Sequence, residues 1–167
     1  MAEIAELLPK GTILITGSVR APDLPPGVKI TQAYNSIYVI DHDGSILSTY
    51  DKLHLVPFGE FVAFCHELRF ISELKKIPRD FAPGSQPGLA TVSGHRIATV
   101  ICFESAFGYQ VRPLVQAGAQ AIIVSTNNRS YRRSANSAQH VAIGQMRAAE
   151  TGRPLVQAAI SGISAII

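Results

Sequence analysis

The sequence predicts an α/β fold built around a mixed β-sheet. Strand-like and helix-like patterns alternate after residue 95, as they do when crossover helices join parallel strands. Two hairpin patterns come earlier, one turning at "HDG" (42–44) and one at Gly94. The chain has 167 residues, of which 47% are hydrophobic and 16% charged. This composition suits a globular core, and we expect residues 1–167 to form a single domain.

The first half of the chain is predicted to be mainly extended. Residues 12–19 form a continuous apolar and β-branched run, which predicts a strand buried on both faces. Residues 33–41 and 45–52 predict the two strands of the first hairpin. We also expect the last turns of a helix at residues 2–8 and a helix at 66–76 within a long irregular stretch.

The second half predicts strands and helices in alternation. Residues 88–93 and 96–103 predict the second hairpin, and residues 104–118 predict one helix despite Pro113. A buried strand is expected at 119–127, an amphipathic helix at 137–152 with Gly152 as its C-cap, and further strands at 154–161 and 163–167.

Composition and spacing exclude several classes of function. The two cysteines and five histidines show neither zinc-ligand spacing nor a disulfide framework, and the N-terminus lacks the basic segment of a signal peptide. The longest apolar runs are far shorter than the ~20 residues that a membrane helix needs. The net charge is +3. Arg129, Arg132 and Arg133 form the most basic stretch, which fits a solvated loop better than an anion site.

Candidate chemistry lies where predicted strands end. Cys102 follows the apolar run "TVI", with Glu104 two positions later, and Lys52 and Glu60 flank a loop. Open α/β sheets place their sites in loops after strand carboxyl ends. A lysine can stabilise a thiolate or an oxyanion, a glutamate can hold that lysine or relay a proton, and backbone N–H groups after Cys102 can bind an oxyanion.

Each of these residues also has a purely structural interpretation. A lone cysteine in an apolar strand is more often packing than nucleophile. Lys52 alone fits a surface lysine, Glu60 a turn residue and His54 a packed histidine. Cys65 does not lie in a predicted strand, and we assign it no functional role. Residue types and spacing therefore predict an α/β domain with a candidate cysteine nucleophile.

Longer motifs carry a family resemblance. The segments "YDKLHLVPFGEFVAF", "ICFES", "QHVAIGQMRAAETGRPLV" and "SGISAII" resemble the nitrilase superfamily, and within it the bacterial apolipoprotein N-acyltransferases. The resemblance implies an α-β-β-α sandwich, with Cys102 as the nucleophile that carries a thioester and Lys52 as its catalytic lysine. It also implies catalytic roles for Glu60 and Glu104, and oxyanion support from the backbone N–H of Phe103. Asn127, at the end of the predicted strand, is a candidate for supporting the site.

The sequence departs from that family in three places. The family's general base is a glutamate in a Trp-Pro-Glu-like motif, whereas this chain has no tryptophan and Glu3 and Glu6 do not match the motif. The family's membrane helices have no counterpart. The loop after "VSTN" reads "NRSYRRSANS" in place of an aromatic-Phe-Gly segment. We therefore expect a fragment cut at both ends, inactive or very slow by itself.

The resemblance implies one function, and two alternative functions remain open. It implies transfer of an acyl chain from phospholipid through Cys102 to the N-terminal amine of a diacylated lipoprotein, at the outer face of the bacterial inner membrane. It implies no metal or organic cofactor. The sequence shows no nucleic-acid-binding module, and its short apolar runs predict no membrane span within this chain. The alternatives are a soluble carbon–nitrogen hydrolase acting on a small amide or nitrile, and a non-catalytic scaffold.

Overall fold

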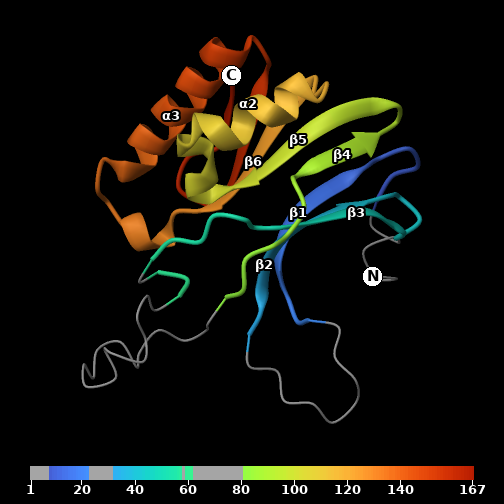
Figure 1. The fold of residues 1–167 in the computed structure, drawn as a ribbon, viewed down its shortest axis with the longest axis horizontal. Coiled ribbons are helices and arrows are strands. Elements are labelled where there is room, and N and C mark those ends of the chain that lie inside the picture. The colour runs from blue at the N-terminus through green and yellow to red at the C-terminus, as the bar shows by residue number, and fades with distance from the viewer. Residues whose placement is uncertain (1–7, 23–31, 58, 62–80) are drawn as a thin grey trace.

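A computed structural model describes residues 8–22, 32–57, 59–61 and 81–167, which form two β-sheets and a layer of helices (Figure 1). The predicted helix at 66–76, all but the last residue of the one at 2–8, and Cys65 lie outside these residues. The described part confirms the α/β class and shows three stacked layers, which are helices, a five-stranded sheet and a three-stranded sheet.

The three-stranded sheet is antiparallel and contains β1 (Leu14–Arg20), β2 (Tyr34–Ile40) and β3 (Ile46–Asp51) in that order. The predicted hairpin is confirmed, with Gly44 in its turn. The prediction that the first strand is buried on both faces is wrong. β1 pairs only with β2 among the described strands, and Gly17, Ser18 and Val19 are exposed.

The five-stranded sheet has the order β4 (Leu89–Val92), β5 (His95–Ile101), β6 (Ala121–Asn127), β7 (Leu155–Ser161) and β8 (Ala165–Ile166). The central strands β5, β6 and β7 are parallel, while β4 and β8 pair antiparallel at the two sides. The sheet is therefore mixed, as predicted. Parallel pairing brings the carboxyl ends of β5, β6 and β7 to one edge.

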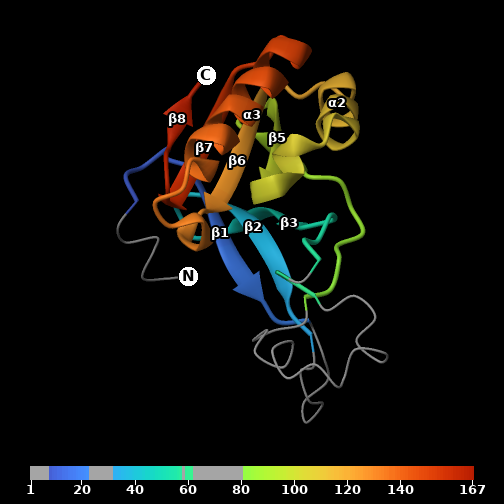
Figure 2. The same cartoon turned by 90° about the vertical axis from the view of Figure 1, so that its left-hand side faces the viewer.

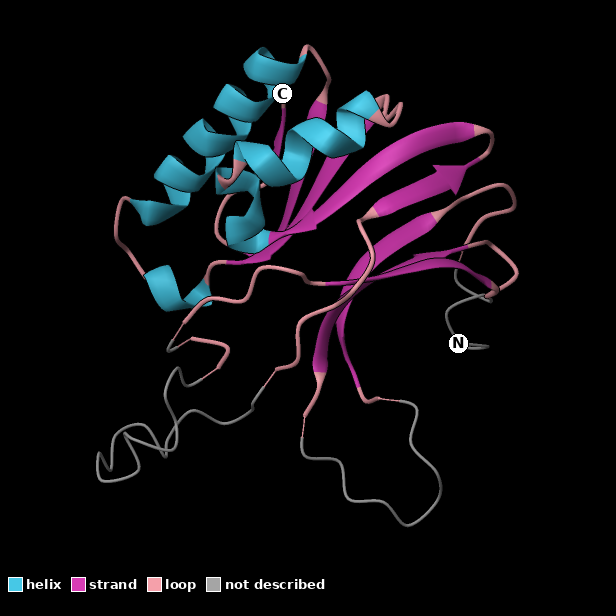
Figure 3. Ribbon diagram, viewed as in Figure 1, coloured by secondary structure: helices cyan, strands magenta, loops and turns pink. Residues whose placement is uncertain are grey.

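Two helices, α2 (Gly108–Gln116) and α3 (Asn136–Thr151), cover one face of this sheet (Figures 2 and 3). Two short 3₁₀ helices are also present: η2 (Cys102–Ala106) follows β5 directly, and η3 (Arg129–Tyr131) follows β6 after Asn128. The single helix predicted over residues 104–118 is wrong. Phe107 has extended dihedral angles and separates η2 from α2, so the chain changes direction there.

The layers are held together by two apolar clusters. One lies between the helices and the five-stranded sheet and includes Val100, Val111, Leu114 and Ile122. The other lies between the sheets and joins Ile37, Tyr50 and Ile101 to the half-buried Cys102. The sheets approach closely at Gly17, where a Cβ atom would lie 2.8 Å from Ser125 Oγ. The candidate nucleophile therefore borders the core between the two sheets.

Candidate active site

Cys102 sits at the point where β5 ends and η2 begins. Its φ angle is +53°, a left-handed conformation that non-glycine residues adopt uncommonly. The turn takes the chain out of the sheet immediately after the last strand residue. A strained residue at the carboxyl end of a central parallel strand is a common setting for a catalytic group.

Glu104 is completely buried and ties this turn to the loop that follows β3. One carboxylate oxygen accepts hydrogen bonds from the backbone N–H groups of Leu53 and His54, both at 2.9 Å. The other accepts from the N–H of Ile101 at 2.8 Å, and the Tyr50 hydroxyl lies within 2.9 Å of both oxygens. Burial and the adjacent Glu104 charge raise the pKa of Tyr50 far above its ordinary value, so this hydroxyl remains a donor.

Lys52 and Glu60 form an ion pair in which the lysine is buried and the glutamate is partly buried. The Lys52 side chain is 1% exposed, and its Nζ lies 2.6 Å from Glu60 Oε2. The same oxygen accepts from the N–H of Val56 at 2.9 Å, and Glu60 Oε1 accepts from Asn35 Nδ2 at 2.7 Å. The interpretation of Lys52 as a surface lysine is therefore wrong, and Glu60 is more than a turn residue.

The structure thus brings four of the predicted residues into one region. Lys52 and Glu60 contact each other directly, while Glu104 lies two residues after Cys102 and holds the backbone next to Lys52. A carboxylate with donors on both oxygens is suited to fixing the position of a loop rather than to exchanging protons.

The two predicted support residues are placed differently. Phe103 is 40% exposed and packs edge-on against Phe107, with ring centroids 5.1 Å apart. The side chain of Asn127 is exposed, and its Oδ1 accepts a hydrogen bond from the N–H of Arg129 at 3.1 Å, in the turn that precedes η3. No described contact joins Asn127 to Cys102.

The residue after it, Asn128, is 2% exposed and lies in a network that the sequence did not reveal. Its Oδ1 lies 3.2 Å from Nδ1 of the buried His140, whose Nε2 lies 3.1 Å from the carbonyl oxygen of Cys102. Ser105 Oγ lies 3.2 Å from the same Nε2 and donates to the same carbonyl at 3.0 Å. In the sequence, His140 was marked only as a histidine within the predicted amphipathic helix, which does not indicate a role in the site.

A cavity of about 180 Å³ opens beside this network. Burial raises the pKa of the Tyr131 hydroxyl, and the electrostatic influence of Cys102 raises it further. The cavity is lined by Phe103, Tyr131, Asn136, Gln139, His140 and Ile143. Its walls are aromatic, aliphatic and amide groups, which suit a neutral, partly apolar group.

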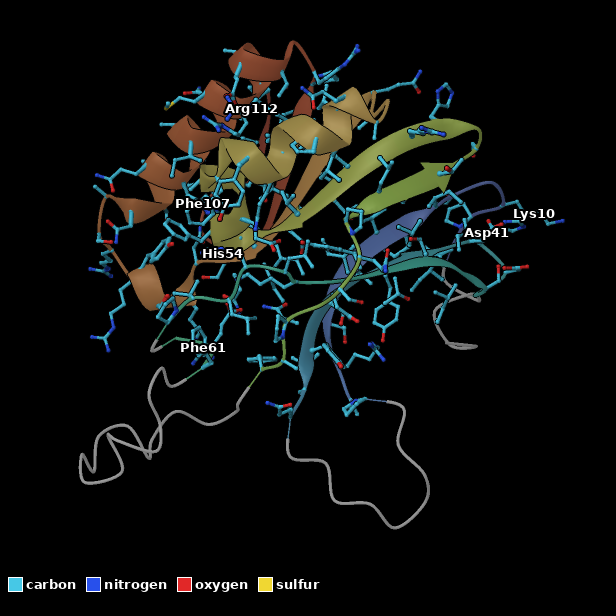
Figure 4. All side chains as sticks on the ribbon, in the orientation of Figure 1. Lys10, Asp41, His54, Phe61, Phe107 and Arg112 are labelled. Carbon is cyan, nitrogen blue, oxygen red and sulfur yellow. The ribbon has the colours of Figure 1, made fainter. Side chains whose placement is uncertain are left out.

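His54 packs as the sequence predicts. Its ring lies 4.2 Å from that of Phe107, and the two side chains point toward each other in Figure 4. The Tyr109 hydroxyl lies 3.1 Å from His54 Nδ1. These contacts hold the loop after β3 against the start of α2.

The model of the carbon–nitrogen hydrolase family matches residues 1–167. The chain belongs to the carbon–nitrogen hydrolase family. Solved structures agree with this assignment. The carbon–nitrogen hydrolase of Helicobacter pylori superposes with a TM-score of 0.61 over 88% of this chain and 45% of its own, at 19% identity.

An amidase from Nesterenkonia sp. AN1 superposes with a TM-score of 0.64 over 94% of this chain and 53% of its own, at 21% identity. A mutant of that amidase carries the acetamide moiety of fluoroacetamide covalently on its active-site cysteine. At these identities the likeness shows the shared nitrilase fold.

Two curated relatives are more similar in sequence. An apolipoprotein N-acyltransferase of Bradyrhizobium diazoefficiens is 50% identical over the whole of this carbon–nitrogen hydrolase chain, and that of Rhodopseudomonas palustris is 46% identical. The chain spans 32% of the length of each relative. No helix among the described residues is long and apolar enough to cross a membrane.

Proposed function

We propose that this chain belongs to the catalytic part of an apolipoprotein N-acyltransferase. The observation that carries the proposal is 50% identity across the entire chain to a relative of that name, together with a Lys52–Glu60 ion pair on the loop that Glu104 ties to the Cys102 turn. The substrates proposed are a phospholipid as acyl donor and a diacylated lipoprotein as acceptor. The proposed location is the bacterial inner membrane, with this domain on its outer face.

The first half-reaction is acyl transfer to Cys102. The Cys102 thiolate attacks an ester carbonyl of the phospholipid, a carbon–sulfur bond forms, and the ester carbon–oxygen bond breaks to release a lysophospholipid alcohol after protonation. Negative charge develops on the carbonyl oxygen. The Lys52 ammonium and the backbone N–H of Phe103 are proposed to stabilise that charge.

The second half-reaction resolves the thioester. The α-amine of the lipoprotein's N-terminal cysteine attacks the thioester carbonyl, an amide bond forms, and the carbon–sulfur bond breaks to return the thiol. The amine loses a proton in this step, so the reaction needs a general base.

Neither described glutamate of the site is proposed as that base. Donors occupy both oxygens of Glu60 and both of Glu104. We assign Glu60 to positioning Lys52, and Glu104 to holding the loop and the nucleophile turn together. This assignment supports the expectation that the chain by itself is inactive or very slow.

Hydrolysis of a small amide is the alternative reaction in this family, and a non-catalytic scaffold is the alternative role. The relatives at 46–50% identity carry the acyltransferase name, whereas the amidase is only 21% identical. A scaffold has no requirement for an ion pair with a lysine that is 1% exposed.

The test replaces the matching third of the Bradyrhizobium relative with this chain and assays the chimera beside the chain alone. We expect the chimera to acylate a diacylated lipopeptide from phospholipid and its Cys102→Ala variant to be inactive. Turnover of butyramide without lipopeptide acylation would favour the hydrolase. A folded chimera inactive on both substrates, beside an active parent, would favour the scaffold.

A further inference from the structure

The carbonyl group of Cys102 is held by two side chains from different elements. His140 Nε2, from α3, lies 3.1 Å from that oxygen, and Ser105 Oγ, from η2, lies 3.0 Å from it. His140 is 3% exposed and Ser105 is completely buried. Because the carbonyl is pinned within the core, the left-handed turn at Cys102 has little freedom to relax.

We propose that His140 is a positioning residue that orients and polarises the peptide group between Cys102 and Phe103. This inference rests on the proposed role of Cys102 as the nucleophile. A peptide group is planar, so fixing its carbonyl also fixes its N–H, which belongs to Phe103. The same N–H is the proposed oxyanion donor. A hydrogen bond received by the carbonyl also polarises the peptide and strengthens that donor.

The proposed role requires a particular arrangement of protons in the network. Both ring nitrogens of His140 face oxygen atoms, Asn128 Oδ1 and Cys102 O, yet a neutral imidazole donates from only one nitrogen. Burial lowers the pKa of His140, which favours the neutral ring. The hydrogen bond to Cys102 therefore requires the proton on Nε2, and Nδ1 must accept.

Rotation of the Asn128 amide by half a turn meets that requirement. Its nitrogen would then donate to His140 Nδ1 and to the Thr126 hydroxyl, which lies 2.9 Å from the same amide position. In the unrotated orientation Asn128 Nδ2 is buried without a hydrogen-bond partner. Rotation replaces that unpaired donor with an unpaired oxygen, which is the less costly arrangement.

Two motifs that had no assigned role meet at this network. His140 comes from "QHVAIGQM", and Gly162 of "SGISA" lies against Asn128. A Cβ atom at Gly162 would lie 2.8 Å from Asn128 Cβ, and the φ angle of this glycine is +109°. A glycine is thus required for Asn128 to occupy its place behind His140.

The test compares two reactions of the same thiol. In a Cys65→Ser background, p-nitrophenyl acetate acylates Cys102: the carbon–sulfur bond forms, p-nitrophenolate leaves, and an oxyanion develops on the way. Iodoacetamide alkylates the same thiol by displacing iodide and develops no carbonyl oxyanion. A defect in the oxyanion peptide slows acylation alone, whereas a defect in thiol access or ionisation slows both.

We expect His140→Phe to lower the rate of acylation about 10- to 100-fold relative to alkylation, and His140→Gln to recover most of it. The control His95→Gln changes an exposed histidine that contacts Gln120 and should alter neither rate. An unchanged ratio of the two rates in His140→Phe would overturn the proposal.

A second measurement uses the wild-type chain and therefore does not depend on whether a variant folds. In the wild-type chain labelled with ¹⁵N-histidine, NMR at about pH 7.5 should show His140 neutral with its proton on Nε2. A proton on Nδ1, or on both nitrogens, would overturn the proposal. Failure of lipopeptide acylation in the chimera, with both of these results as expected, would instead count against the proposed function.

Discussion

The Nζ atom of Lys52 lies 2.6 Å from Oε2 of Glu60, and the lysine side chain is 1% exposed. Removing one partner of a buried pair leaves an uncompensated charge. We expect Lys52→Met to lower the free energy of unfolding by about 3 kcal/mol, measured by urea denaturation. The double variant Lys52→Met/Glu60→Gln should recover part of this loss.

An exposed pair provides the matched control. The Arg112 side chain is 55% exposed and contacts Glu150 at 2.9 Å, so Arg112→Met should cost no more than about 1 kcal/mol. If Lys52→Met and Arg112→Met lowered the free energy of unfolding equally, the burial of Lys52 would have no energetic consequence.

Glu104→Gln preserves the shape of the side chain but places an NH₂ group where an oxygen accepts hydrogen bonds. The N–H groups of Leu53 and Ile101 approach opposite oxygens, so either amide orientation leaves a buried donor unpaired. We expect a loss of about 3 kcal/mol in the free energy of unfolding.

The control for that substitution is Glu150→Gln, because the Glu150 side chain is 26% exposed and one of its two arginine partners, Arg112, is 55% exposed. Its loss should stay below about 1 kcal/mol. If Glu104→Gln lowered the free energy of unfolding as little as Glu150→Gln does, the result would contradict the role of Glu104 in holding the loop and the turn together.

The pH dependence of stability should report His140. Burial lowers its folded-state pKa below the ordinary value of 6.5, so the unfolded chain binds the proton more readily. The stability that depends on neutral His140 is full above pH 6.5 and is lost as the pH falls toward the folded-state pKa. His140→Gln should therefore show a smaller fall in unfolding free energy between about pH 7.5 and 5 than the wild type. Parallel curves for the two proteins would contradict this prediction.

Much of the fold could be predicted because local patterns agree with the final structure. The hairpin turns at Gly44 and Gly94, the parallel strands and the helix ending at Gly152 all follow from turn chemistry and apolar periodicity. The exposure of β1 could not be predicted this way, because an apolar run does not specify how many neighbours its strand has. The break at Phe107 was missed because flanking residues favour helix on both sides.

The site was predicted less completely than the fold. Cys102, Lys52, Glu60 and Glu104 stood out as reactive residue types within recognisable motifs. Asn127 was chosen because it ends the predicted strand, yet the buried side chain is that of Asn128. A one-residue shift at a strand end reverses which side chain faces inward, and no pattern in "TNN" fixes it. His140 was missed because its partner is a backbone carbonyl, which leaves no mark on the sequence.

In the proposed reaction Cys102 carries the acyl group as a thioester. The most direct measurement is the intact mass of the chimera after incubation with phospholipid and no lipopeptide, followed by hydroxylamine. We predict one added acyl chain, mapped to Cys102 by peptide sequencing, absent in Cys102→Ala and released by hydroxylamine as expected of a thioester. No added mass on a folded chimera, under conditions in which the parent enzyme is acylated, would contradict the account.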